Sequence, residues 1–555
     1  MGLFDENTVK TLNRSEFLAL FADGDMNRDR AAQAYELAQS IDEIVSAQRL
    51  VSLLSTTDST EAIVKAARLR LQGTDGLRGV MSPREVDYRE GLSAFLRSKE
   101  LTPALLQLLV KSFLLENGGQ KVYLGEDGRD DEEKAFVTAC YSALEEETRA
   151  SLFLGTVPSA VVAYASLEGA GVMVTASHNP ATDNGIKFFV GGRKLTKTEE
   201  YALTARAFEL AQREEVSPKA PLPSPNQAML IRYSTILTNE VSLNELKSRS
   251  LIIDCANGAG KELLDHISVH AEVICTEGVI NDRCGAALYD SAREIPRSGP
   301  YPSALAQMLA LRVDEFGGTH FGIALDGDAD RAIVLVAEED SSSIRILGGD
   351  EIAALLLPHL AKRFASRKMV TYTIESNPRV IQGIEAAHPH VTFLERSVGD
   401  RNLAFGVEDE LILGFEESGH VLWPVDTDLG VLFSGSGLAT GLLAVANYQK
   451  ELIRTLVDSE RVVVTVFTEA SKRWYHNSSL FEETRTLIEA AVNTKREIFA
   501  EDEDLLLYRL GDGEVVYARA SGTEPKLQIV FPAKESLRLE RVVQYIGLLS
   551  DSFLS

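Results

Sequence analysis

Three aspartates at alternate positions follow an apolar run, and this feature constrains the fold more than any other in the chain. The run spans residues 321–325, and the aspartates after it are Asp326, Asp328 and Asp330. Carboxylates at the end of a buried strand need a cation, and a curled loop lets all three reach one hard ion. An EF-hand would need Gly and Glu where this chain has Arg331 and Ala337. The sequence therefore predicts a Mg²⁺ loop with open positions for phosphate oxygens.

A serine stretch follows a second apolar run in the same way. Residues 171–174 predict a short buried strand, and Ser177 and His178 come next with Asn179 and Pro180, which favour a turn. A serine held on a loop by a rigid sheet is suited to act as a nucleophile or a phosphate carrier. Because most Ser-His pairs in loops are only solvated, this assignment depends on the other loops of the chain.

The length and the net charge of the chain limit the number of domains and the kinds of partner to expect. A chain of 555 residues is too long for one core and predicts about three to five domains. Its formal charge of −26 argues against nucleic acid or an anionic membrane as a partner. An enzyme that acts on anions would need Arg and Lys concentrated locally against this repulsive background.

Features of the whole chain predict a cytoplasmic protein with reduced thiols. No run approaches the ~18 apolar residues that a membrane span needs. The N-terminus lacks a basic segment followed by an apolar stretch, so no secretory signal is expected. The cysteines are scattered without a close CxxC pair: Cys140, Cys255, Cys275 and Cys284.

The chain divides by composition into an extension and several α/β segments. Residues 1–70 predict helices with one apolar face, and we expect this extension to serve docking or homodimerisation. Four prolines within residues 214–226 predict a linker. Between these parts, strand-like runs alternate with helical runs, which predicts a mainly parallel sheet with functional loops at the carboxyl ends of its strands.

Basic side chains lie inside loops of small residues. Arg78 belongs to the glycine-rich stretch 73–79, where it could meet a phosphate or simply complete a turn. Lys187 precedes a Gly-Gly pair within residues 183–194, which predicts a hairpin that brings this lysine near the serine. Arg519 is followed by Ser521, Gly522 and Thr523 between two strand-like runs, and this combination of charge, hydroxyls and amides predicts an anion cradle.

A further loop, after the apolar residues 411–413, carries groups suited to a polyhydroxylated ligand. Glu416 and Ser418 are spaced to hydrogen-bond neighbouring sugar hydroxyls. His420 could serve a phosphate or a proton transfer, or could be a satisfied structural histidine.

Together these loops resemble the α-D-phosphohexomutase family, in the family's order and with comparable spacing over residues 71–550. The resemblance implies mixed α/β architecture, with four domains around a central cleft, the last a smaller α+β domain. The expected boundaries are a helical extension at 1–70, a phosphoserine domain at 71–226, a metal-binding domain at 227–345, a sugar-binding domain at 346–458 and a phosphate-binding domain at 459–555.

The same resemblance implies a phosphomutase and a role for each motif residue. The enzyme would interconvert a sugar 1-phosphate and 6-phosphate, with hexose 1,6-bisphosphate as intermediate and activator and one Mg²⁺ per site. Ser177 would carry the phosphoryl group and, with Asp326, Asp328 and Asp330, hold the metal. The transferring group would be surrounded by Arg78, His178, Lys187 and Arg331, with Lys187 an acid/base candidate. Substrate would be bound by Glu416, Ser418, His420, Arg519, Ser521, Gly522 and Thr523.

Within the family, the motifs are most similar to those of phosphoglucosamine mutases. Three positions depart from that branch: Phe415 replaces Gly, Glu417 replaces Gln and Ser436 replaces Asp. The stretch Cys284-Gly285-Ala286 is similar to phosphoacetylglucosamine mutases. The sugar therefore stays open among glucosamine, glucose, mannose and N-acetylglucosamine phosphates. A non-catalytic sugar-phosphate-binding relative and a metal-dependent phosphatase are the alternatives of other classes.

Overall fold

The computed structural model describes much of the chain from Leu71 onward. It describes residues 71–544 apart from gaps at 74, 118–120, 131–132, 148–149, 242, 275–279, 281–284, 290–292, 457–460, 468–473, 475–477, 500–501, 503, 521–525, 537–538 and 540–542. The helical extension expected at residues 1–70, with its proposed role in dimerisation, lies outside the described residues. Among the helices of the described part, none combines the length and apolar character needed to cross a membrane.

The first sheet carries the serine loop (residues 175–182). Its strands are β1 (Leu77–Met81), β2 (Glu100–Leu101), β3 (Val122–Glu126), β4 (Ser151–Thr156), β5 (Ala170–Val174), β6 (Asp183–Val190) and β7 (Arg193–Lys194). They pair in the order β2-β1-β6-β5-β3-β4, with β7 beside β6. The helices of this segment are α6 (Tyr88–Ser98), α7 (Pro103–Asn117), α8 (Ala135–Glu147), α9 (Ser159–Ala165) and α10 (Lys197–Arg213).

The second sheet carries the aspartate loop (residues 326–331). Its strands are β8 (Ser250–Asp254), β9 (Glu272–Ile274), β10 (Glu294–Pro296), β11 (Thr319–Leu325), β12 (Ala332–Glu338) and β13 (Ser343–Leu347). They pair in the order β10-β13-β12-β11-β8-β9. The helices of this segment are α11 (Ala228–Glu240), α12 (Leu243–Leu246), α13 (Gly260–Leu264) and α14 (Ala304–Phe316).

The third sheet carries the glutamate loop (residues 416–420). Its strands are β14 (Met369–Thr373), β15 (Thr392–Arg396), β16 (Leu411–Phe415) and β17 (Val421–Leu422), and a separate ribbon pairs β18 (Val425–Thr427) with β19 (Gly430–Leu432). The sheet order is β15-β14-β16-β17. The helices of this segment are α15 (Gly349–Arg363), α16 (Pro378–Ala387), α17 (Arg401–Ala404), α18 (Gly437–Ala446) and α19 (Lys450–Thr455).

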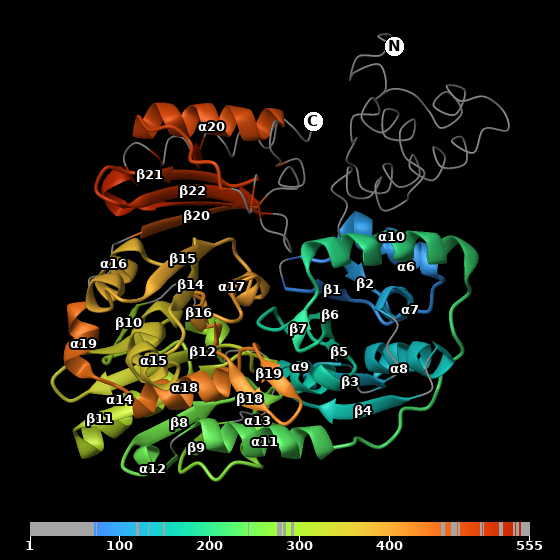
Figure 1. The fold of residues 1–555 in the computed structure, drawn as a ribbon, viewed down its shortest axis with the longest axis horizontal. Coiled ribbons are helices and arrows are strands. Elements are labelled where there is room, and N and C mark those ends of the chain that lie inside the picture. Colours follow the sequence, from blue (N-terminus) through green and yellow to red (C-terminus); the bar gives the residue numbers. More distant parts are fainter. Residues whose placement is uncertain are drawn as a thin grey trace.

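The fourth sheet lies against the third (Figure 1). Its strands, in the order β20-β23-β22-β21, are β20 (Arg461–Phe467), β21 (Leu506–Arg509), β22 (Val515–Ala520) and β23 (Lys526–Pro532). Alternate residues face opposite sides, as strand geometry requires. One side packs under α20 (Ser479–Val492) through Leu506 and Tyr508, and the other packs on Ile374 of the third segment through Leu507 and Tyr517.

The sheets are mixed, so the mixed α/β fold class is confirmed but the expectation of a mainly parallel first sheet is wrong. β3 is parallel to β4 and β5, whereas β6 is antiparallel to both β5 and β1. The reason is that each motif loop joins two antiparallel neighbours. The pairs are β5 with β6, β11 with β12, β16 with β17 and β22 with β23.

A continuous apolar core fixes the first three sheets relative to one another. It contains Phe189 from the first sheet, Ile323 from the second and Leu413 from the third, all fully or almost fully buried. Burial of this kind stabilises by about 25 cal/mol per Å² of apolar surface. The serine, aspartate and glutamate loops are therefore held on one packed body.

Candidate active site

Ser177 lies in the serine loop, and its side chain points toward the aspartate loop. Its side-chain hydroxyl donates to Asp326 Oδ2 at 2.7 Å, and its backbone N–H donates to Thr175 Oγ1 at 2.8 Å. The residue is fully buried and has φ 53°, in the left-handed region that disfavours residues with a Cβ. Such backbone strain is kept only where the surroundings hold it, and here it aims the hydroxyl.

Arg129, which follows β3, holds the backbone of the serine loop. Its guanidinium pairs with Asp127 at 2.7 Å and donates to the backbone carbonyl of Ser177. It also donates to the carbonyls of Asn179, Pro180 and Asp183, at 3.3, 3.4 and 3.1 Å. One buried cation thus satisfies loop carbonyls that would otherwise be costly to bury.

The aspartate loop is suited to a metal ion. One carboxylate oxygen from each of Asp326, Asp328 and Asp330 lies within 4.8 Å of the others, and all three residues are buried. Asp328 Oδ1 and Asp330 Oδ1 have no hydrogen-bond partner among the described residues. Burial, with the neighbouring Asp330 and Asp328, raises the pKa of Asp326 to about 8. A hard divalent cation would satisfy the unpaired oxygens and relieve this repulsion, so the cluster fits Mg²⁺.

Two lysines from the first sheet reach the same cluster. Lys187 on β6 donates to Asp328 Oδ2 at 2.6 Å and Asp330 Oδ2 at 2.8 Å, and its side chain is 1% exposed. Lys194 on β7 lies 3.5 Å from Asp330 and also pairs with Asp75. Burial would lower the pKa of Lys187, but Asp328, Asp330 and Asp75 outweigh it and raise that pKa above its ordinary value. Lys187 is therefore a fixed positive charge and a potential proton donor.

Arginines from two sheets surround the serine. Arg78 on β1 donates to Asp75 Oδ2 at 2.5 Å and to Asn179 Oδ1 at 2.8 Å. Arg331 Nη2 lies 3.7 Å from Asp75. Burial, together with Arg331 and Arg78, holds the pKa of His178 well below its ordinary value, so its ring is neutral. The side chains expected around the transferring group are thus brought together.

The glutamate loop meets the same centre from the third sheet. His420 pairs backbone to backbone with Arg331, and its ring nitrogens lie 3.7 Å from Asp330 and 3.1 Å from Asp400. Glu416 is buried and accepts from the Gly399 backbone N–H at 2.8 Å, whereas Ser418 is partly exposed. Burial raises the pKa of the Glu416 carboxyl. The loop therefore adds a shielded carboxyl and an imidazole to the edge of the aspartate cluster.

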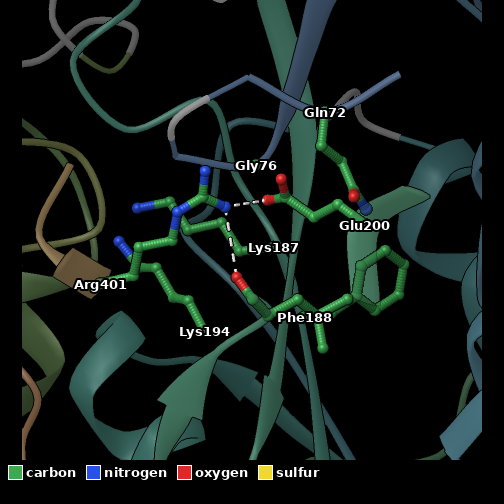
Figure 2. Close-up of a pocket in the computed structure, with 8 residues that line it drawn as sticks. Gln72, Gly76, Lys187, Phe188, Lys194, Glu200 and Arg401 are labelled. Carbon is green, nitrogen blue, oxygen red and sulfur yellow. Dashed lines mark hydrogen bonds and ion pairs between the residues drawn. The ribbon is translucent and has the colours of Figure 1, made fainter. Parts of the chain in front are cut away.

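A small cavity marks the seam between the first and third segments (Figure 2). Arg401 of α17 crosses the seam to donate to Glu200 of α10 at 2.5 Å and to the carbonyl of Leu195 at 3.2 Å. Lys194 crosses it to pair with Asp400 at 2.8 Å. These contacts fix the third segment against the hairpin that carries the lysines.

The predicted anion cradle is only partly described. Ser521, Gly522 and Thr523 lie outside the described residues. Arg519, on β22, forms an ion pair with Glu375, which lies in the loop between β14 and α16. A second arginine of the fourth sheet, Arg461 on β20, donates to Glu417 Oε2 at 2.7 Å. The expected phosphate-binding arginine is thus placed against the third sheet.

Sequence reasoning missed several charged residues of the site. No role was assigned to Asp75, Arg129, Lys194, Asp400 or Glu375, although two of them lie in stretches that the sequence had marked. Asp75 lies in the glycine-rich stretch with Arg78, and Lys194 lies in the hairpin with Lys187. Their partners are distant in sequence, so local spacing carried no signal of the pairing.

Family models match three consecutive parts of the chain. They are phosphoglucomutase/phosphomannomutase alpha/beta/alpha domain I at residues 69–214, domain II at 232–339 and domain III at 348–460. A phosphoglucosamine mutase from Acidothermus cellulolyticus is 30% identical over 502 residues, covering 87% of this chain and 96% of that protein. The chain belongs to the α-D-phosphohexomutase family. As a member, it is a phosphomutase, and the expected recognition and enzyme class are confirmed.

Solved structures share the fold. A phosphoglucomutase/phosphomannomutase family protein from Burkholderia thailandensis has a TM-score of 0.59 at 19% identity, covering 86% of this chain and 97% of that one. N-acetylphosphoglucosamine mutase from Aspergillus fumigatus, in complex with GlcNAc-6P and magnesium, has a TM-score of 0.51 at 17% identity, covering 86% and 95%. At these identities the likeness supports the phosphohexomutase architecture alone.

Proposed function

We propose that this phosphohexomutase interconverts the 1-phosphate and 6-phosphate of a hexosamine, with glucosamine phosphate as the favoured sugar. The observation that carries the proposal is the hydrogen bond of 2.7 Å from Ser177 Oγ to Asp326, inside a buried cluster of three aspartates. A serine hydroxyl bonded to a cluster that fits a cation is suited to carry a phosphoryl group, because the cation offsets the negative charge of that group.

The reaction proceeds through two phosphoryl transfers at one serine. The phosphoryl group of phosphorylated Ser177 passes to the free hydroxyl of the sugar monophosphate, which yields the hexose 1,6-bisphosphate and the free serine. The bisphosphate turns end for end, and its other phosphoryl group passes back to Ser177 Oγ. Phosphoryl transfer depends mostly on position and charge neutralisation, which the fixed cations at this site provide.

Each side chain has a role consistent with its position. Lys187, held protonated, is placed to give a proton to the departing serine oxygen, while Arg78 and Arg331 neutralise the phosphoryl oxygens. Mg²⁺, held by Ser177 and the three aspartates, would supply further positive charge. Glu416, Ser418 and His420 would bind the sugar, and Arg519 with residues 521–523 would hold the phosphate that is not being transferred.

The choice of sugar rests on the relatives. The relatives named phosphoglucosamine mutase match across 84–87% of this chain at 27–30% identity. The Aspergillus enzyme in complex with GlcNAc-6P and magnesium supports a sugar phosphate and Mg²⁺ as ligands. We infer a small-molecule sugar phosphate as the partner, with no nucleic acid or membrane, in a cytoplasmic enzyme. We also propose that the enzyme forms a homodimer through its extension at residues 1–70.

Replacement of Ser177 tests the proposal directly. Intact-mass analysis of the native protein should show one phosphate that is lost in Ser177→Ala, and the variant should lose turnover of glucosamine 1-phosphate to the 6-phosphate. The wild-type assay should be repeated with glucose, mannose and N-acetylglucosamine 1-phosphates to rank the sugars. Phosphate mapped wholly to another residue, or release of inorganic phosphate without any isomerised sugar, would contradict the mechanism.

A further inference from the structure

The guanidinium of Arg519 is occupied by a carboxylate of the protein itself. Its Nη2 pairs with Glu375, and the two side chains are 15% and 21% exposed. The same nitrogen lies 3.4 Å from Gln528 Oε1 on β23, and Arg519 Nε is buried without a hydrogen-bond partner among the described residues. Arg519 therefore binds a carboxylate through Nη2, while its Nε–H has no acceptor among the described residues.

The loop that carries Glu375 is tied to the glutamate loop. Arg461 donates through Nη1 to the backbone carbonyl of Glu375 at 2.7 Å and through Nη2 to Glu417 Oε2 at 2.7 Å. The Glu375 charge is also close enough to contribute to the raised pKa of the Glu416 carboxyl. The pair of Arg519 and Glu375 thus lies beside the groups proposed to bind the sugar.

We propose that Glu375 is an internal competitor that holds Arg519 until a phosphate group displaces it. The proposal rests on the proposed function, in which Arg519 binds the phosphate that is not transferred. A carboxylate binds the same N–H donors of a guanidinium that two phosphate oxygens would bind. Arg519 therefore cannot hold both anions through these donors at once. A sugar phosphate gains additional contacts at the glutamate loop, whereas inorganic phosphate does not. Glu375 therefore makes the site selective for phosphate that arrives attached to a sugar.

Contacts other than this pair also join the fourth sheet to the third segment. Arg509 of β21 pairs with Glu395 of β15, and Arg379 of α16 pairs with Glu514 at 2.9 Å. The apolar contact of Leu507 and Tyr517 with Ile374 joins the same two segments. Glu375 differs from the other acidic partners because its arginine lies on β22, the strand that leads into the predicted anion cradle.

The test compares Glu375→Gln with the wild type in the full-length enzyme. Glutamine keeps the size of the side chain and removes its charge. Inhibition of turnover by inorganic phosphate should become about three- to tenfold stronger, as expected when one competing charged contact is removed. KM for the sugar phosphate should fall by a smaller factor. In an Arg519→Ala background the substitution at Glu375 should have no further effect on inhibition by phosphate.

Glu395→Gln is the matched control, because it removes a carboxylate from another arginine of the fourth sheet. It should leave phosphate inhibition unchanged, and an equal shift in this variant would mean that loosening of the sheet explains the effect, which would overturn the proposal. Unchanged phosphate inhibition in Glu375→Gln, with KM raised in Arg519→Ala, would also overturn it. If Arg519→Ala left KM unchanged in both reaction directions, the assignment of Arg519 in the proposed function would be the part that fails.

Discussion

At the scale of single residues, the site shows how a chain of charge −26 can gather cations for an anionic ligand. Asp75 contacts Lys187 at 3.2 Å and also pairs with Lys194 and Arg78. Burial would raise the pKa of Asp75, but these cations hold it well below its ordinary value. One buried carboxylate therefore keeps three cations charged and oriented, because their repulsion would otherwise oppose packing them together.

The second aspartate of the aspartate loop provides a prediction at this scale. Asp328→Asn should cut turnover on the order of a hundredfold, because the site loses part of the charge that binds Mg²⁺. Wild-type protein should also melt at a higher temperature when Mg²⁺ is added, and the variant should show a smaller increase. Calorimetric melting curves with and without Mg²⁺, together with the coupled assay, measure both effects.

The control for this variant is Asp265→Asn, which changes an exposed aspartate of the same segment. It should retain both activity and the response to Mg²⁺. Full activity of Asp328→Asn, or of the wild type in excess chelator, would show that the aspartate loop does not hold a required metal.

At the scale of elements, the recurring unit is a pair of antiparallel strands joined by a functional loop. β5 and β6 flank the serine loop, and β11 and β12 flank the aspartate loop. Behind the aspartate loop, Gly258 approaches so closely that a Cβ would lie 2.1 Å from the Gly327 carbonyl oxygen. The glycine-containing turn at residues 256–260 therefore supports the aspartate loop.

Arg129 gives the prediction for the serine loop. Arg129→Lys keeps a positive charge beside Asp127 but cannot donate to several loop carbonyls at once, so some become buried without a partner. The free energy of unfolding should fall by about 2–3 kcal/mol. Because the loop positions Ser177, kcat should fall at least roughly tenfold, with a smaller change in KM.

Chemical denaturation and steady-state kinetics measure the two effects of Arg129→Lys. Arg84→Lys serves as the comparison, because Arg84 is an exposed arginine with ion pairs to Glu90 and Glu100. It should be close to the wild type in both measurements. If Arg129→Lys kept the wild-type kcat, the hydrogen bonds from Arg129 would not be what positions Ser177 in the serine loop.

At the scale of the whole molecule, the first three sheets share a core while the fourth is joined largely through ion pairs and a separate apolar cluster. Glu417 connects three of the segments at one point. It pairs with Arg293 of the second segment and with Arg461 of the fourth sheet. Its departure from the glutamine that is usual in the most similar branch of the family thus has a structural reason, since a carboxylate serves two arginines better than an amide does.

Glu417→Gln should weaken this connection modestly. Glu417 is 23% exposed and Arg293 is 35% exposed, so solvent screens the pairs and the loss should be about 0.5–1 kcal/mol. The melting temperature should fall at low salt, and the difference from the wild type should shrink at high salt because ions screen the pairs. The exposed Glu85→Gln is the control. An unchanged melting temperature at low salt would mean that Glu417 does not join the segments.

The sequence by itself determined which loops carry chemistry. An apolar strand followed by Ser177, by the three aspartates or by Glu416 is a local pattern, and the strands β5, β11 and β16 formed where those patterns predicted them. Polar groups placed directly after a buried strand are held at the edge of a sheet, so their chemistry can be inferred without knowing what faces them.

Only the tertiary structure decided which charges meet. Lys194 and Asp400 belong to different segments and lie far apart in the chain, as do Glu375 and Arg519. Each pair forms because the packing of separate segments brings two opposite charges within reach, and a charge shielded from solvent is stable only beside a partner. Local spacing encodes no such distance, because it is set by the shared core and by the way the fourth sheet lies on the third.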